Sequence, residues 1–381
     1  MMHFRTTFTA IGVALLVAAC GGGSNDAGSS AAKVTSLKVM GDSLADSGTF
    51  GGLKFTVQGA DTKIYPELVA QSYGLTLCSA YAGNPATGII GTATAPGCSN
   101  YAVGSGRINY YAAPTAKYSI VQQLQDASAS GNYAAGDMLL IDGGGNDAAD
   151  LVGAYLGASA GVNGVAAYTS FLGTVLTQAD VGSAVSLGSI GMAVAGNQYM
   201  LGLADKFANA ITTYALDRGA QRIVILNMPG VTNTPRFQMV LGGIEAARGA
   251  QGRADAEALF KSWIESFNAR LAARFAGNSK VAIVDFYTTF NNWVANPAQY
   301  SFANVRTPAC PPTGLGSDGL PTYTFPTCTS TALSAAPPAG VTTGAGWWKT
   351  YLFSDGFHPT PYGHQLAATV ISDTLKSAGW I

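Results

Sequence analysis

Four short apolar runs constrain the fold of this chain more than any other feature. They occupy residues 37–40, 137–142, 222–227 and 280–285. Near-continuous apolar runs of this length are typical of strands that are covered on both faces, as in a parallel sheet. We therefore expect a central sheet buried between two layers of helices.

Helical patterns separate the last three runs. Large apolar side chains recur there at spacings of three and four, the period of a helix with one buried face. A glycine follows each pattern and favours the end of a helix. This alternation predicts a doubly wound α/β sheet, whose ligands bind beyond the carboxyl ends of the strands. The apolar positions are Tyr199, Leu203, Phe207, Ile211 and Tyr214 in one helix, and Phe260, Trp263, Phe267 and Leu271 in the other.

The N-terminus reads as an export signal. Residues 1–19 contain Arg5 and an apolar stretch shorter than the roughly 20 residues that span a bilayer, as in a signal peptide. The segment ending at Cys20 resembles the bacterial lipobox, so we expect Cys20 to be lipidated and residues 20–33 to form a flexible tether. Gly21 offers no retention signal of the Asp type, which favours the outer membrane. The alternative is an ordinary signal peptide with Cys20 near the cleavage site by chance.

Four cysteines remain after this cleavage. An even number in an exported protein suggests two disulfides, for which three connectivities exist. We favour Cys78–Cys98 and Cys310–Cys328, because each pair closes a local loop of about twenty residues. A metal site is the rival interpretation, but the chain has no CxxC spacing and keeps only two histidines. No metal is expected.

Charge and composition limit the class of partner and the number of domains. The chain has 20 basic and 21 acidic residues, and only 11% of its residues are charged, which argues against a nucleic-acid partner. We expect one domain over residues 34–381. Residues 150–193 are predicted to form a helical excursion over the site, and residues 303–346 a surface loop stapled by the second cysteine pair. A helix over 361–378 closes the fold.

Histidine chemistry can involve only two residues once the N-terminus is removed. Asp355 lies three residues before His358, so it can orient the imidazole ring and leave the other nitrogen free as a base. A purely structural His–carboxylate pair is the alternative. His364 has no such companion, and we expect it to be an ordinary polar residue of the last helix.

The nucleophile and the groups around it follow the first two apolar runs. Ser43 lies in a Gly-Asp-Ser-Leu turn that projects its hydroxyl above the sheet edge, although such turns also occur for conformational reasons alone. Asn146 follows three glycines at the same edge, where its amide can donate to an oxyanion; helix capping is the alternative role. A third segment, residues 100–106, has backbone N–H groups that can complete such an oxyanion hole.

Taken together, these segments resemble the four diagnostic blocks of the SGNH/GDSL hydrolases. The resemblance runs from Val34 to the C-terminus and is strongest to the larger lipase-like and phospholipase/hemolysin-like branch. It implies a flavodoxin-like three-layer α/β/α sandwich with a mostly parallel sheet, and ester hydrolysis without metal or cofactor. The blocks are Gly41-Asp42-Ser43-Leu44, the Gly104 region, Gly144-Gly145-Asn146-Asp147 and Asp355-Gly356-Phe357-His358-Pro359.

The resemblance also implies a role for each matching residue. Ser43 is the nucleophile, His358 the base and Asp355 the group that orients it. Relatives usually have two adjacent glycines where this chain has Gly104-Ser105, so which of the two donates a backbone N–H is open. The implied oxyanion hole consists of the Ser43 N–H, the Asn146 side chain and one N–H from Gly104 or Ser105.

The implied substrate is an acyl ester or lipid. The apolar stretch 150–193 and the membrane tether favour this class. A polysaccharide O-deacetylase uses the same chemistry and is one alternative. The other is a surface lipoprotein that keeps the fold for binding and is catalytically silent.

Overall fold

The structure of the chain is a computed structural model that describes residues 33–91, 96–341 and 344–381. The signal peptide predicted for residues 1–19, Cys20 and the tether up to residue 32 lie outside the described residues. Within the described ranges, no helix combines the length and the apolar character that crossing a bilayer requires.

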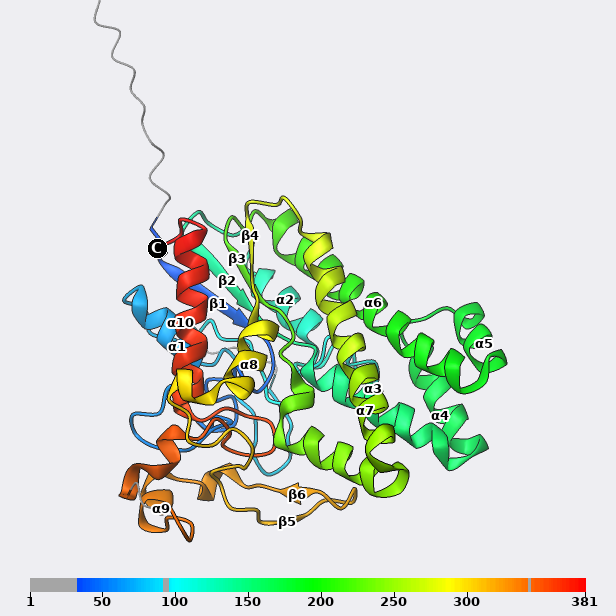
Figure 1. Cartoon of the computed structure of the whole chain (residues 1–381). Coiled ribbons are helices and arrows are strands. Elements are labelled where there is room, and N and C mark those ends of the chain that lie inside the picture. Colours follow the sequence, from blue (N-terminus) through cyan, green and yellow to red (C-terminus); the bar gives the residue numbers. More distant parts are fainter. Residues whose placement is uncertain (1–32, 92–95, 342–343) are drawn as a thin grey trace, which may run out of the picture. The chain divides into compact units, whose positions relative to one another are not determined.

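Four parallel strands form the central sheet, in the order β1-β2-β3-β4 (Figure 1). Each strand coincides with one of the four apolar runs, and neighbours pair in register, with Val39 opposite Leu140. Every residue of β3 is buried, as expected for a strand covered on both faces. The α/β fold is confirmed. The strands are β1 (Ser36–Met40), β2 (Asp137–Ile141), β3 (Ile223–Leu226) and β4 (Val281–Val284).

An irregular segment, residues 99–103, continues the sheet beyond β1. The Val39 N–H donates to the Ser99 carbonyl at 3.0 Å, and the Tyr101 N–H donates to the Val39 carbonyl at 2.7 Å. The segment therefore runs parallel to β1 and ends beside its carboxyl end. This position brings Gly104 next to the turn that contains the predicted nucleophile.

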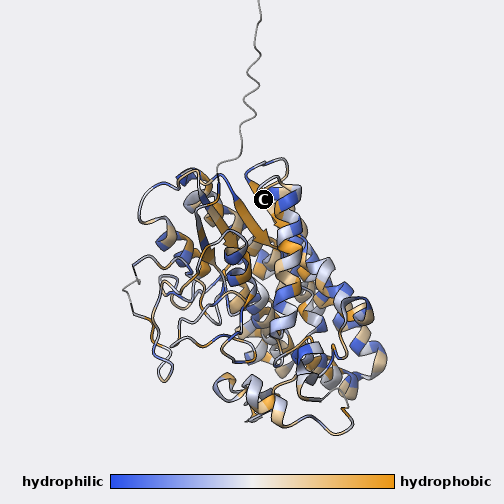
Figure 2. Ribbon diagram, turned by 90° about the vertical axis from the view of Figure 1, so that its left-hand side faces the viewer, coloured by the Kyte–Doolittle hydropathy of each residue, from blue (hydrophilic) through white to orange (hydrophobic). Residues whose placement is uncertain are grey.

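Helices cover both faces of the sheet (Figure 1). Side chains of successive strand residues point to opposite faces, so Val39 belongs to one apolar core and Met40 to the other. Figure 2 shows the strands as a hydrophobic band. The result is the three-layer sandwich that the resemblance implies. One face carries α1 (Tyr65–Ser72), α8 (Phe286–Ala295) and α10 (Pro361–Ser377), and the other α2 (Ile120–Ser128), α6 (Gly188–Tyr214) and α7 (Pro235–Arg274).

The two predicted helices are α6 and the second half of α7. Their patterned side chains are buried, except for the half-buried Tyr214. Gly219 has a φ of +85° beyond the end of α6, as a helix-ending glycine requires. The helix α7 begins much earlier than the pattern predicts, and Gly249, with a φ of +73°, breaks it into two.

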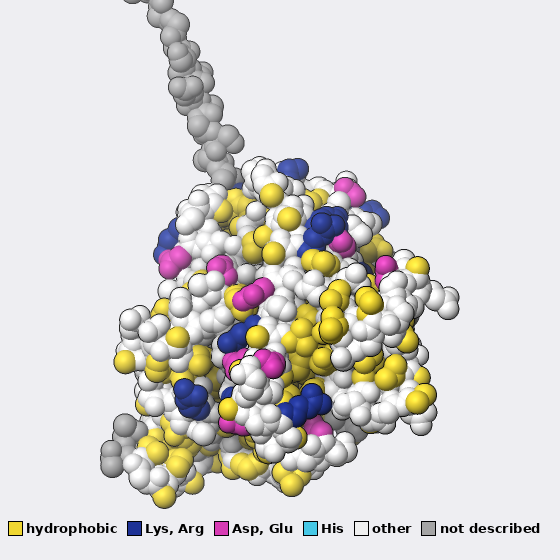
Figure 3. Space-filling model, turned by 45° about the vertical axis from the view of Figure 1, so that its right-hand side comes forward, with side chains coloured by type: hydrophobic (Ala, Val, Ile, Leu, Met, Phe, Trp, Pro, Cys, Tyr) yellow, Lys and Arg dark blue, Asp and Glu magenta, His cyan; other side chains and the backbone are white. Residues whose placement is uncertain are grey.

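The excursion over residues 150–193 is helical, as predicted, but it does not cover the site. It comprises most of α3 (Gly145–Gly157), then α4 (Val162–Leu172) and α5 (Gln178–Ser186), and projects to one side (Figure 1). Its Tyr168 and Phe171 pack into the core with α6, and none of its residues lines the cavity at Ser43. Figure 3 brings this side forward and shows many hydrophobic and few charged side chains.

The structure forms both disulfides that we favoured, Cys78–Cys98 and Cys310–Cys328. The second closes a loop that contains the short hairpin of β5 (Gly314–Leu315) and β6 (Pro321–Thr322), and α9 (Ser330–Ala335) follows it. This loop is more than a surface addition. Its Phe325 is buried in a small apolar cluster with both half-cystines and extends to the site.

Candidate active site

The turn after β1 is fixed before it reaches Ser43. The Gly41 N–H donates to Gln123 Oε1 at 2.8 Å, and the Asp42 N–H donates to Asp142 Oδ1 at 3.0 Å. A Cβ atom on Gly41 would lie 1.6 Å from that same Asp142 oxygen, so only glycine fits this position. These contacts set the direction in which Ser43 leaves the sheet.

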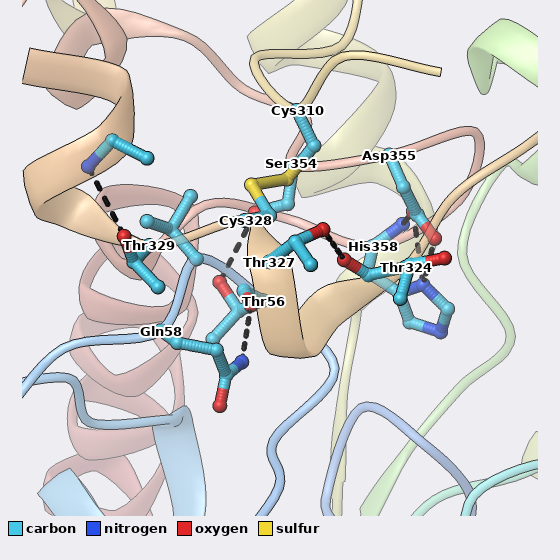
Figure 4. Close-up of a disulfide and its surroundings, with 12 residues drawn as sticks. Thr56, Gln58, Cys310, Thr324, Thr327, Cys328, Thr329, Ser354, Asp355 and His358 are labelled. Carbon is cyan, nitrogen blue, oxygen red and sulfur yellow. Dashed lines mark hydrogen bonds and ion pairs between the residues drawn. A yellow bond between two sulfur atoms is a disulfide. The ribbon is translucent and has the colours of Figure 1, made fainter. Parts of the chain in front are cut away.

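Ser43, His358 and Asp355 form one hydrogen-bonded chain. The Ser43 Oγ lies 2.7 Å from His358 Nε2, although the two residues are 315 positions apart in sequence. The other ring nitrogen, Nδ1, lies 2.9 Å from both carboxylate oxygens of Asp355 (Figure 4). The same carboxylate accepts the backbone N–H of Phe357 and of His358. This geometry fits a nucleophile, a base and the group that orients the base.

The protonation states of His358 and Asp355 depend on their burial and on the interaction between the two side chains. Burial lowers the pKa of the His358 imidazole, but the Asp355 carboxylate outweighs it, and the net shift is upward from the usual 6.5. Burial raises the pKa of Asp355, but His358 and the backbone N–H bonds outweigh this effect and hold it below its usual range. Asp355 therefore stays ionised and stabilises a protonated ring.

Aromatic side chains surround the imidazole. The Phe55 ring lies 5.4 Å from the His358 ring, and Phe325 meets it edge-on at 5.5 Å. Phe357 contributes a third ring at 6.4 Å. These rings cover much of the imidazole and limit its positions.

Two groups that can stabilise an oxyanion lie near Ser43. Asn146 lies in the first turn of α3, lines the cavity and donates one of its two amide N–H bonds to the Gly106 carbonyl at 3.0 Å. The Gly104 N–H donates to Asp46 Oδ2 at 2.8 Å. Ser105 lines the cavity and adopts a φ of +64°. The sequence allowed either Gly104 or Ser105 as the backbone donor to the oxyanion. The Gly104 N–H already donates to a carboxylate, so it is the less suitable of the two.

A protein-family model described as GDSL-like Lipase/Acylhydrolase matches residues 37–371. The chain belongs to this family. The match covers Ser43, Asn146, Asp355 and His358, and membership makes the protein an enzyme that hydrolyses esters. The search of curated proteins found no match.

The GDSL hydrolase has a cavity of about 220 Å³ that opens at Ser43. Its walls are mostly apolar and come from several separate parts of the chain, between residues 42 and 359. Two buried carboxyl groups, those of Asp42 and Asp142, lie on its polar side, and burial raises the pKa of both. Because the rest of the wall is mostly apolar, the cavity offers an apolar environment beside the Ser43 hydroxyl. Its main apolar residues are Leu44, Phe55, Leu226, Phe286, Phe290 and Phe357.

The second histidine of this GDSL hydrolase is not the ordinary polar helix residue we expected. His364 is 1% exposed, and its Nδ1 accepts the Tyr65 N–H at 3.4 Å. Burial lowers its pKa to about 3, so the ring is neutral. Its Nε2 has no hydrogen-bond partner among the described residues. His364 shares a helix face with Ala368, Ile371 and Leu375, and this spacing in the sequence indicates burial.

Sequence reasoning missed several residues that shape the site, Asp46 and Phe325 among them. Asp46 holds Gly104, and its place three residues after Ser43 was the only available signal. Phe325 reaches His358 from within the stapled loop, whose conformation no local pattern reveals. Both act through contacts between segments that are distant in the sequence.

Proposed function

We propose that the enzyme hydrolyses carboxylic esters of apolar acyl groups through an acyl-enzyme on Ser43. The observation that carries this proposal is the 2.7 Å contact between Ser43 Oγ and His358 Nε2 at the mouth of an apolar cavity. A serine hydroxyl is a weak nucleophile by itself, and an adjacent base activates it.

The reaction follows from the order of these groups. His358 takes the Ser43 proton as Oγ attacks the ester carbonyl, and Asp355 stabilises the imidazolium. The tetrahedral intermediate collapses, and the alcohol leaves with the proton from His358. Water then attacks the acyl-enzyme with the same assistance, which releases the acid and restores Ser43.

We assign the oxyanion to the Ser43 N–H, the Ser105 N–H and the free amide N–H of Asn146. Ser105 is favoured over Gly104 because the Gly104 N–H is bonded to Asp46. In comparable sites the loss of one such donor costs about 10²- to 10³-fold in rate.

The cavity favours an acyl chain longer than acetyl. Leu226, Phe286 and Phe290 line the cavity and also belong to the buried core beneath the sheet edge. They therefore form the deep part of the cavity. An acetyl group leaves this apolar space empty, and apolar contact there stabilises a longer chain by about 0.8 kcal/mol per buried methylene. The alternative, a polysaccharide O-deacetylase, binds only an acetyl group, which does not fill such a pocket.

A series of p-nitrophenyl esters from acetate to palmitate tests the substrate class. We expect kcat/KM to rise from acetate to a longer chain, and Phe290→Ala to move the optimum to a still longer one. Highest activity on acetate, together with turnover of an acetylated glycan, contradicts the acyl-chain assignment and supports the deacetylase.

Ser43→Ala tests the nucleophile, with a fluorophosphonate probe as a second readout. The wild type is expected to be labelled and active, and the folded variant to be neither. An active Ser43→Ala enzyme shows that another group attacks the ester. A wild type that is neither labelled nor active supports the catalytically silent lipoprotein instead.

We also propose that the enzyme is a lipoprotein of the outer membrane, anchored through Cys20. The two disulfides indicate an extracytoplasmic protein, and the lipobox-like segment supports the anchor. Palmitate labelling of the wild type and of Cys20→Ala tests this proposal. Equal labelling of the two proteins contradicts it, and loss of labelling in the variant supports it.

A further inference from the structure

The Ser105 turn has an unusual backbone for its sequence. The Gly106 N–H donates to the Val103 carbonyl at 2.9 Å and closes a four-residue turn. Ser105 is the third residue of this turn. Its φ of +64° is a value that residues other than glycine rarely adopt. A positive φ at this position alone is that of a type II turn, which favours glycine there.

The peptide groups on both sides of the Ser105 N–H are held in place. The Gly104 N–H donates to Asp46 Oδ2 at 2.8 Å. The Ser105 carbonyl accepts a hydrogen bond from Arg107 Nη1 at 2.7 Å. Between these two fixed groups, the orientation of the Ser105 N–H follows from the conformation of the turn.

Arg107 is in turn held by a two-pronged ion pair with Asp150. Its Nε lies 2.5 Å from Asp150 Oδ2 and its Nη2 3.0 Å from Oδ1. Asp150 lies on α3, the helix that carries Asn146. A second carboxylate of this helix, that of Asp147, accepts the N–H groups of Ile108 and Asn109. Helix α3 therefore fixes the position of the turn relative to the Asn146 side chain.

We propose that Arg107 and Asp150 form a positioning pair for the oxyanion hole, which holds Ser105 in its left-handed conformation with its N–H toward the cavity. The proposal rests on the proposed function. Without this pair, Ser105 relaxes to a negative φ, which flips the preceding peptide and turns its N–H away. The pair explains how a serine can occupy a position whose conformation favours glycine.

Arg107→Met tests the pair, and Arg270→Met is its matched control. Arg270 makes the same two-pronged contact, to Asp205, at 2.9 and 3.0 Å, but on the outer face of α6 and α7. For Arg107→Met we expect kcat on p-nitrophenyl butyrate to fall ~10- to 100-fold, with KM changed less than about threefold, since the loss approaches that of one oxyanion donor. Arg270→Met is expected to keep the wild-type kcat.

Two further variants separate positioning from a general loss of structure. Asp150→Asn is expected to lower kcat in the same way, and the double variant to lose no more than Arg107→Met alone. Ser105→Gly added to Arg107→Met is expected to restore kcat about tenfold, because glycine adopts a positive φ without strain.

The outcomes distinguish this inference from the proposed function. If folded Arg107→Met and Asp150→Asn keep the wild-type kcat, or if Ser105→Gly rescues nothing, the positioning role is wrong. If the wild type hydrolyses no ester, or Ser43→Ala remains active, the proposed function fails and the pair loses its role with it.

Discussion

The disulfide Cys310–Cys328 is expected to support both stability and catalysis, whereas Cys78–Cys98 supports stability alone. The loop that Cys310–Cys328 closes carries Phe325, which packs against the His358 ring. The Cys310 N–H also donates to the Ser354 carbonyl at 2.8 Å, one residue before Asp355 (Figure 4).

The two pairs are nearly equal in their expected effect on unfolding. Their sequence separations are 18 and 20 residues. For loops of this length, the lost entropy of the unfolded chain corresponds to about 3 kcal/mol at 25 °C for each disulfide. Replacing either pair with serines is therefore expected to lower the free energy of unfolding by about this amount. The two variants thus form a matched comparison.

The assay combines urea unfolding with steady-state kinetics on p-nitrophenyl butyrate, under conditions in which both variants are folded. We expect the double variant of Cys310 and Cys328 to lose about tenfold in kcat, because small displacements of a catalytic group are costly. The double variant of Cys78 and Cys98 is expected to keep its kcat. Equal kcat values in the two variants at equal stability refute the reasoning.

Three further predictions follow from the site. The acid limb of the pH–rate profile is expected to have its midpoint above 6.5, because His358 must lose a proton to act as a base and its pKa is raised; Asp355→Asn should move this midpoint down and lower kcat by about 10⁴-fold. Gly41→Ala places a methyl group on the Asp142 carboxylate and is expected to destabilise the fold by about 1–3 kcal/mol and to lower kcat, as thermal unfolding and kinetics can show. Asn146→Ala is expected to lower kcat by about 10²- to 10³-fold with little change in KM, and an unchanged kcat removes it from the oxyanion hole.

The strands and the positions of the main candidate residues were predictable because local pattern determines them. An apolar run of the right length predicts a buried strand, and the strand order then places Ser43 and Asn146 at the same edge. The Asp355–His358 pair is separated by only three residues. Its geometry therefore depends little on the rest of the fold.

The contacts between distant segments were not predictable in this way. The choice between Gly104 and Ser105 depends on Asp46, and the shielding of His358 depends on a loop with no regular pattern. The excursion of α4 and α5 was misplaced because its apolar residues pack with α6, and periodicity does not say which partner a helix face meets. His364 is different, since its spacing on α10 already pointed to burial.

The direction of β1 has a practical consequence. The strand runs from Ser36 toward Ser43, and α10 returns from the catalytic edge to the far end of the sheet, where the C-terminus also lies (Figure 1). An affinity tag, a fluorophore or a solid support joined at the C-terminus is thus attached at the end of the sheet opposite the entrance for substrate. Immobilised preparations of this hydrolase are expected to turn over their esters as fast as the free protein does.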